Sequence, residues 1–352
     1  MNLKKTIYHI THWETWHYLA KYIPIAPVWC WYCIRARSLW FFMPSNPTLT
    51  FSGFEGETKR EMYEQLPPHS FPKTIYLSYQ ADIESILKQV NASGLHYPFA
   101  VKPDAGMMGL MFRKIKTDKE LADYHKVMPA NYIAQELIDY PLEVSVFYYR
   151  VPGADRGTIT GFIKKEFLQV TGDGTSSLNQ LIDWYPRASF RIEEVKSKHS
   201  ARLNDILPAG FNYILSHALN LSRGGKLVSL EKEKDDQLLK VFDEISHYTK
   251  HFYYGRYDIK CTSVEALKNG QNFSILEYNG CGAEPHHIYG NDNTLFQAYR
   301  IVLAHWKIMY HIASINYLAG YERWSYNKGR KFLRNAKKHF RVLKSLDHST
   351  NI

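Results

Sequence analysis

Cysteine and long apolar runs are both scarce in this sequence of 352 residues. The four cysteines are too few and too unevenly spaced for a disulfide scaffold, so a reducing cytoplasm is the expected compartment. Cys30 and Cys33 have the CxxC spacing, but without a second pair we interpret them as small core residues rather than a zinc or redox site. No apolar run reaches the ~18 residues of a membrane span, and His9, His12 and Glu14 interrupt any signal-peptide core.

Charge is distributed unevenly along the chain. The formal net charge is +10, with hydrophobic residues at 45% and charged residues at 22%, as in an ordinary globular protein. Residues 321–352 hold nine Lys or Arg and two Asp or Glu, so most of the excess positive charge lies at the C-terminal end. The rest of the chain is close to neutral, which excludes a uniformly basic protein.

An aromatic arm begins the chain. The pattern from Thr11 to Glu14 is that of a capping box, and Pro24 would end the helix that follows. A second helix is predicted from about Pro27, and residues 28–42 would be only about 22 Å long as a helix, short of a bilayer core. Two alternatives remain: a buried helix, or a helix lying in the membrane interface.

Two helices are predicted at the other end. Apolar residues recur at helical spacing from Leu295 to Ala313, which indicates a core helix that ends before Gly320. Residues 328–346 form a basic amphipathic helix, which either docks by its apolar stripe or contacts an anionic membrane surface. A membrane is favoured over nucleic acid because no nucleic-acid motif is present, so the expected location is the cytoplasm or the inner face of the membrane.

The middle of the chain contains a candidate phosphate site. Lys59 lies on a short predicted helix, and after a strand beyond Pro72 and a helix over residues 82–93, a short apolar strand ends at Lys102. A loop with Gly106 and Gly109 follows. Such a loop lets backbone N–H groups approach phosphate oxygens, while a lysine adds positive charge.

Side chains whose oxygens could bind a metal ion follow further along the sequence. Residues 255–287 are predicted to form two strands joined by a Gly/Asn turn, with Asp258 on the first and Glu277 and Asn279 on the second. Strand alternation would put Ile275 on the same face as Glu277 and Asn279. Two carboxylates and an amide suit a hard divalent cation that also binds nucleotide phosphates.

The order of these features resembles the ATP-grasp superfamily, in particular its D-alanine:D-alanine ligase and cyanophycin synthetase branch. The resemblance covers residues 59–289, and its most specific segments are VKPDAGMMG, QELIDYPLEVSV, VTGDGTSSLNQLI, NLSRGG and the RYD…ILEYN pair. It implies an α+β fold in which two subdomains, residues 57–131 and 132–320, clasp the nucleotide. A helical N-terminal arm (residues 1–56) and a basic C-terminal helix (residues 321–352) would flank them.

The resemblance also implies roles for individual residues. The nucleotide phosphates would contact Lys59, Lys102 and the loop with Gly106 and Gly109. The purine would lie along Glu136, Leu137, Ile138 and Asp139, and the ribose would contact Glu143. Two magnesium ions, with Mn²⁺ as an alternative, would be held by Asp258, Glu277 and Asn279, and the catalytic residues would be Arg256 and Lys102.

The implied activity is ATP-dependent ligation of a carboxylate to an amine through an acyl phosphate, on small-molecule, peptide or lipid substrates. A kinase acting on a hydroxyl and a non-catalytic basic binding protein are the alternatives. The chain departs from D-alanine ligases after Asn279, where it reads GCGAEPHH, and only 58 residues precede Lys59. Candidate substrate contacts are therefore Lys165, Arg223, Glu284, His286 and His287.

Overall fold

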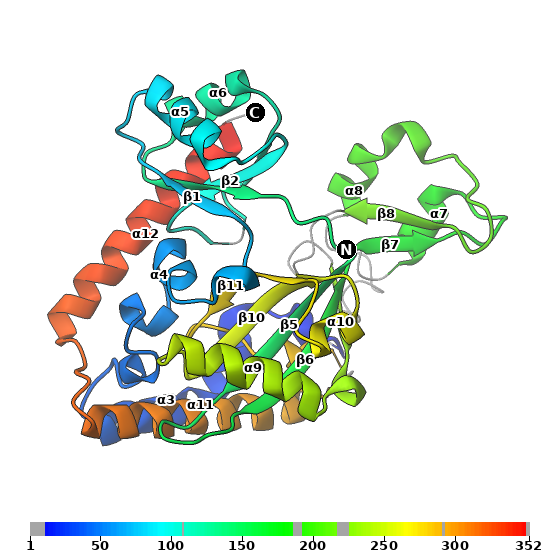
Figure 1. Ribbon diagram of the computed structural model, residues 1–352. Coiled ribbons are helices and arrows are strands. Elements are labelled where there is room, and N and C mark those ends of the chain that lie inside the picture. The colour runs from blue at the N-terminus through cyan, green and yellow to red at the C-terminus, as the bar shows by residue number, and fades with distance from the viewer. Residues whose placement is uncertain (1–10, 108, 186–191, 217–224, 291–292, 350–352) are drawn as a thin grey trace. The chain divides into compact units, whose positions relative to one another are not determined.

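The computed structural model describes residues 11–107, 109–185, 192–216, 225–290 and 293–349 (Figure 1). The chain forms two compact units. Unit 1 comprises Met1–Val28, Phe162–Glu231 and His286–Leu303, and unit 2 comprises Trp29–Gly161, Lys232–Pro285 and Ala304–Ile352. Both units combine helices with strands, and the strand pairs with described registers are antiparallel, which confirms the predicted mixed α and β class.

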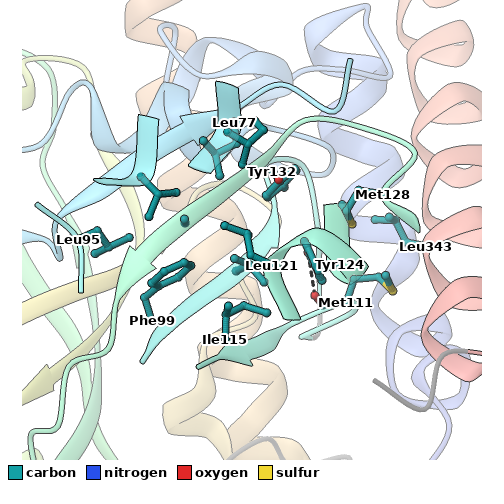
Figure 2. Packing of buried hydrophobic residues seen from close by; sticks show 14 residues of the cluster. Leu77, Leu95, Phe99, Met111, Ile115, Leu121, Tyr124, Met128, Tyr132 and Leu343 are labelled. Atoms are coloured by element: carbon teal, nitrogen blue, oxygen red, sulfur yellow. Dashed lines mark hydrogen bonds between the residues drawn. The ribbon is translucent and has the colours of Figure 1, made fainter. Parts of the chain in front are cut away.

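The first sheet of unit 2 has four strands in the order β1-β4-β2-β3. Their bounds are β1 Thr74–Leu77, β4 Tyr132–Glu136, β2 Phe99–Pro103 and β3 Arg113–Ile115. Helices α5 (Ile83–Ser93) and α6 (Asp118–Val127) supply apolar side chains to its core (Figure 2). Tyr124 of α6 is fully buried there and donates a hydrogen bond to the carbonyl of Met111 at 3.0 Å, so the core also fixes the chain just before β3.

In the second sheet, β10 (Tyr254–Cys261) lies between two other strands. It pairs with β11 (Phe273–Asn279) on one side and with β5 (Leu142–Tyr149) on the other. Strand β6 (Thr158–Glu166) begins in unit 2 and continues into unit 1. Helix α9 (Asp236–Thr249) covers one face (Figure 1), where Phe242 packs against Tyr148 and Tyr257. Successive residues of a strand face opposite sides, so Tyr254, Arg256 and Asp258 lie on the other face.

An aromatic cluster covers one end of that other face. Its buried members come from β5, β10, the end of α3 (Ala26–Ala36), the loop at residues 41–54 and α11 (Leu295–Leu318). Phe147 of β5 and Tyr254 of β10 are its buried members on the sheet, and their ring centroids are 5.1 Å apart. Edge-to-face rings of this kind bury large apolar areas. The cluster therefore packs one side of the second predicted helix of the arm on the sheet, while Trp31 and Ile34 of that helix are exposed.

Unit 1 holds a small two-stranded sheet of β7 (Leu168–Thr171) and β8 (Asn212–Ser216) with α7 (Leu178–Trp184) and α8 (Ile192–Lys198). Ser177 and Gln180 form a capping box at the start of α7. The second half of β6 pairs with β9 (Lys226–Ser229). In the arm, Trp13 stacks on Tyr289 with ring centroids 5.3 Å apart.

Helix α12 (Tyr326–Ser349) uses its apolar stripe within unit 2. Phe332 and Leu333 pack on the aromatic cluster, while Phe340, Leu343 and Leu346 pack on the core of the first sheet. Its cationic residues stay exposed. The predicted helix is confirmed, and its apolar stripe is docked on the protein. No described helix combines the length and hydropathy needed to cross a membrane.

Three local expectations were wrong. The predicted capping box at Thr11 is followed only by a 3-10 turn over Trp13–Thr15, and the α-helix α2 spans Tyr18–Tyr22 with the His17 side chain as its cap. The strand, turn and strand pattern of residues 132–147, which alone would indicate a hairpin, does not form one, because β4 and β5 belong to different sheets. Helix α10 (Val264–Lys268) precedes the Gly/Asn turn between β10 and β11.

We expect Leu343→Ala to lower the free energy of unfolding by about 2–5 kcal/mol, because Leu343 is fully buried and its removal leaves a cavity. The neighbouring Val342 is 39% exposed, so Val342→Ala is the matched control and should change stability by less than about 0.5 kcal/mol. Urea titration followed by tryptophan fluorescence measures both. Equal losses would contradict docking of α12 through this side.

Candidate functional site

Four polar side chains lie on one face of β10 and β11. Asp258 pairs with Glu277, and Arg256 pairs with Asn279, so all four point to the same side of the sheet. The register shifts after Asp258, and Ile259 pairs with Ile275, which leaves Leu276 as a bulge. Ile275 therefore points to the opposite face, contrary to the strand alternation predicted from the sequence.

The carboxylate of Asp258 is the centre of this face. It accepts hydrogen bonds from Nε and Nη2 of Arg256, both at 3.1 Å, from Nδ2 of Asn279 at 3.2 Å, and from the hydroxyl of Ser145 on β5. Nη1 of Arg256 donates to the carbonyl of Glu284 at 2.9 Å. Because Arg256 and Asp258 are both buried, this two-pronged ion pair fixes their orientations. Ser145 was not anticipated from the sequence.

Lys59 approaches the same face. Its Nζ lies 3.7 Å from Oε1 of Glu277 and 3.4 Å from the carbonyl of Gly106. Lys59 opens helix α4 (Lys59–Tyr63), and its backbone N–H donates to the carbonyl of Asp104 at 2.9 Å. The structure thus brings together the helix lysine, the glycine loop and one predicted metal ligand.

Lys102 lies at the end of β2 with its Nζ 6.0 Å from the ring centroid of Tyr63. Burial and, to a smaller extent, the nearby Lys59 lower the pKa of Lys102 to about 7, and Glu277 opposes both. Tyr63 also donates to the carbonyl of Leu276, the bulge residue, at 2.6 Å. A lysine with this pKa is a strong candidate for binding an anion, because a phosphate would stabilise its charged form.

The glycine loop is tied to helix α12 at both ends. His339 is hydrogen-bonded to the carbonyl of Ala105 at 2.8 Å, and Asp347 accepts from the backbone N–H of Met111 at 3.0 Å. Asp347 also forms an ion pair with Arg113 at 3.0 Å. These anchors were missed because they lie more than 230 residues from the loop in sequence and no motif marks them.

The predicted nucleotide residues after β4 lie on two strands. Glu136 ends β4 with an exposed side chain, whose Oε2 accepts from the backbone N–H of Lys73 at 3.4 Å. Glu143 on β5 pairs in register with Lys260 on β10. Nζ of Lys260 donates to the carbonyl of Ile138 at 2.9 Å, which links residues 137–139 to the second sheet. The two glutamates and the linking segment are thus all held within unit 2.

Glu57 is a second unanticipated residue. Its Oε2 is buried and has no hydrogen-bond partner among the described residues. Burial raises the pKa of Glu57 to about 7, and the charge of Glu277 adds to this effect while Lys59 opposes it. A buried carboxylate oxygen without a hydrogen-bond partner is costly in a purely structural role. Its position two residues before Lys59 was the available sequence signal.

The donor set suits a hard cation shared with phosphates. Asp258, Glu277 and Asn279 offer carboxylate and amide oxygens on one face, which is the chemistry that Mg²⁺ prefers. No group of three His, Cys, Asp or Glu side chains in the described part of the chain is placed to hold a metal. An ion at this face would therefore need phosphate oxygens in addition to the protein ligands.

The candidate substrate residues are divided between the units. Glu284 lies in unit 2, where its carbonyl accepts from Arg256, whereas Lys165 on β6 and both His286 and His287 lie in unit 1. Arg223 lies outside the described residues. Cys281 in unit 2 is buried, and burial raises its pKa to about 12, which agrees with a packing role rather than a nucleophilic one.

We expect Lys102→Met to stabilise the nucleotide-free protein below pH 7 by about 1–2 kcal/mol, because it removes a poorly solvated charge. The difference in unfolding free energy between the variant and the wild type should shrink as the pH rises from 7 toward about 10.5. Over that window the folded wild type has released its proton while the unfolded chain retains it, so wild-type stability rises. Urea unfolding at about pH 6 and about pH 9 tests this, with the exposed Lys114→Met as control for losing one charge. An equal advantage at both pH values would contradict the low pKa.

Comparison with known proteins concerns the fold. No protein-family model and no curated protein matches this chain. Among solved structures it is similar to a bifunctional glutathione synthetase from Pasteurella multocida, with 14% identity over 68% of this chain and 34% of that one and a TM-score of 0.43. It is also similar to the VanG D-Ala:D-Ser ligase from Enterococcus faecalis, with 13% identity over 74% and 62% of the two chains and a TM-score of 0.42.

A third similar structure is the ATP-grasp ligase PsnB complexed with a phosphomimetic precursor variant, Mg and ADP, with 14% identity over 72% of this chain and 58% of that one and a TM-score of 0.37. This chain thus spans less than two thirds of the length of each of these three proteins. Structural similarity at these low TM-scores says nothing about the roles of the site residues. Two of the three are ligases by name, and one of these two is an ATP-grasp ligase.

Proposed function

We propose that this protein is an ATP-dependent ligase that joins a carboxylate to an amine through an acyl phosphate. The observation that carries the proposal is the polar face of β10 and β11, where Arg256, Asp258, Glu277 and Asn279 point to one side. Lys59 reaches this face at 3.7 Å from Glu277. Cations and hard-metal ligands in one place are what phosphoryl transfer requires.

The nucleotide would lie between the glycine loop and this face. Lys59 and Lys102 would bind its phosphates, and the backbone of Gly106 and Gly109 would cover them. Gly109 has φ +72° and open space around its Cα, so the loop is built for close backbone approach to a ligand. Glu136 and residues 137–139 would face the purine, and Glu143 the ribose.

Asp258, Glu277 and Asn279 would hold Mg²⁺, which supplies Lewis acidity and offsets charge on the phosphates when bound. Two ions are proposed, as in the resembled family. Glu277 is 39% exposed beside the nearly buried Lys59, so its carboxylate is accessible to a ligand. Asp258 is instead held by Arg256 and Ser145, which sets the direction of its oxygens.

Phosphoryl transfer begins when a substrate carboxylate oxygen attacks the γ-phosphorus of ATP and ADP leaves. Lys102 and Arg256 would stabilise the negative charge on the transferring group. Arg256 is pre-oriented for this, because Asp258 and the carbonyl of Glu284 hold three of its nitrogens. The amine then attacks the acyl carbon, phosphate leaves, and one proton from the ammonium is released.

The segment after Asn279 is proposed to contact the substrates. Glu284 is the nearest of the candidates in the chain, and Lys165, His286 and His287 in unit 1 are the others. Their chemistry suits small-molecule, peptide or lipid carboxylates and amines. We place the reaction in the cytoplasm, where ATP is available and the four free cysteines stay reduced.

Two measurements test the proposal. Calorimetry with ATP, with and without Mg²⁺, should show magnesium-dependent binding, and its absence would support a non-catalytic protein. A panel of carboxylates with hydroxylamine should then yield hydroxamates together with ADP, because hydroxylamine traps acyl phosphates. A phosphorylated hydroxyl product without any hydroxamate or amide would instead identify a kinase.

We expect Glu277→Gln and Asn279→Ala to reduce ATP turnover at least about 100-fold, because the first removes the negative charge of a proposed ligand and the second removes a proposed oxygen ligand. The exposed Glu265→Gln on α10 is the matched control and should keep wild-type turnover. Circular dichroism and urea unfolding of each variant check that the fold is intact. Wild-type turnover in a folded Glu277→Gln protein would remove the metal assignment.

A further inference from the structure

Six large apolar side chains of unit 2 are exposed on three neighbouring segments. They come from the end of α3 and the residues after it, the end of α11 and the start of α12. They are Trp31 (56% exposed), Ile34 (69%), Leu39 (52%), Tyr317 (47%), Leu318 (85%) and Tyr326 (53%), here called the exposed apolar patch. A monomeric protein rarely leaves so many large apolar side chains in water without a binding partner.

Side-chain contacts join the three segments. Arg323 donates to the carbonyl of Ala36, the last residue of α3, at 2.8 Å, and its guanidinium lies 3.8 Å from the ring centroid of Tyr317. Tyr326 stacks on Trp40 with ring centroids 6.5 Å apart. Helices α3 and α11 also lie side by side (Figure 1), where Tyr32 stacks on Tyr310 at 4.7 Å. The patch is therefore one surface.

Cations that form no ion pair with a described carboxylate surround the patch. Arg35, Arg37, Lys328 and Arg330 are exposed, and Arg323 lies within it. None of these five forms an ion pair with a carboxylate in the described part of the chain, although eleven other Lys or Arg residues do. The buried Nε–H of Arg323 has no hydrogen-bond partner among the described residues. These charges are left for an anionic partner to neutralise.

We propose that the exposed apolar patch and its cations bind an anionic phospholipid surface. Tryptophan and tyrosine favour the interface between headgroups and acyl chains, and arginine and lysine beside them attract anionic headgroups. The sequence suggested that the apolar stripe of α12 could serve this purpose. In the structure that stripe is packed inside unit 2. The apolar contact with lipid would therefore be made by α3 and the end of α11.

A second copy of the chain fits this surface less well. A two-fold interface through the patch would bring each set of cations against its own equivalent. The exposed side of α12 adds further positive charge next to it, from Lys331 and Arg334 onward, with Glu322 as the one acid between Tyr317 and Arg334. Such a dimer would be repelled electrostatically, whereas an anionic bilayer is attracted to the same charges.

Co-sedimentation with vesicles tests the proposal on the full chain. Vesicles of phosphatidylcholine with about a quarter phosphatidylglycerol should bind the wild type at least about tenfold more tightly than phosphatidylcholine alone, and added salt should weaken the binding. The double variant Ile34→Ser with Leu318→Ser should lose at least about tenfold of this affinity. The double variant Arg35→Ser with Arg37→Ser should bind anionic vesicles more weakly than the wild type. Its binding should also depend less steeply on salt concentration.

Phe296→Ser is the matched control, because Phe296 is 73% exposed on α11 but lies in unit 1, outside the patch. Analytical ultracentrifugation of the same variants detects self-association. Anionic-vesicle binding that the patch variants leave unchanged would overturn the proposal, as would a dimer that those variants dissociate. Calorimetry with MgATP on each variant is independent of the vesicle result, so a failure of the ligase assignment is seen separately.

Discussion

The buried side chain of Asn46 is the interaction on which the candidate site depends. Its Nδ2 donates to the carbonyls of Ser52 and Tyr254, and its Oδ1 accepts from the backbone N–H groups of Tyr253 and Tyr254 and from the hydroxyl of Tyr278. One amide therefore fastens the loop after the aromatic arm to the start of β10 and to β11. The functional carboxylates follow within a few residues on the same strands. A fully satisfied buried amide gives this junction one arrangement.

The same junction holds the segment after Asn279, where the sequence stops resembling D-alanine ligases. The backbone N–H groups of Cys281 and Gly282 donate to the carbonyls of Ser52 and Gly53, so this segment packs directly on the loop at residues 52–54. A Cβ on Gly280 would lie 2.3 Å from the carbonyl oxygen of Ser52. Glycine is required there by close backbone approach. The substrate side of the proposed site is thus shaped partly by the short N-terminal arm.

Elements with their own local signals were predictable from the sequence. The helix after Asp82, the strand ending near Lys102 and the basic C-terminal helix all have such signals, and each was found within a few residues of its expected bounds. What failed depends on partners distant in sequence. The bulge at Leu276 arises from the pairing of β11 with β10, and β4 and β5 are separated because each pairs in a different sheet. Local alternation contains no information about either.

Burial gives two charged residues a property that the sequence does not show: Glu57, which was missed, and Lys102, which was predicted as a site residue. Glu57 and Lys102 are ordinary charged residues in the sequence, yet in the fold burial moves both pKa values to about 7, from opposite directions. Both lie near Glu277, so the nucleotide-free site contains charges that are poorly solvated and incompletely paired. Phosphate oxygens would relieve the cost at Lys102. The rest of unit 2 must supply the stability that holds these groups in place, which is consistent with the rigid anchoring by Asn46 on one side and by α12 on the other.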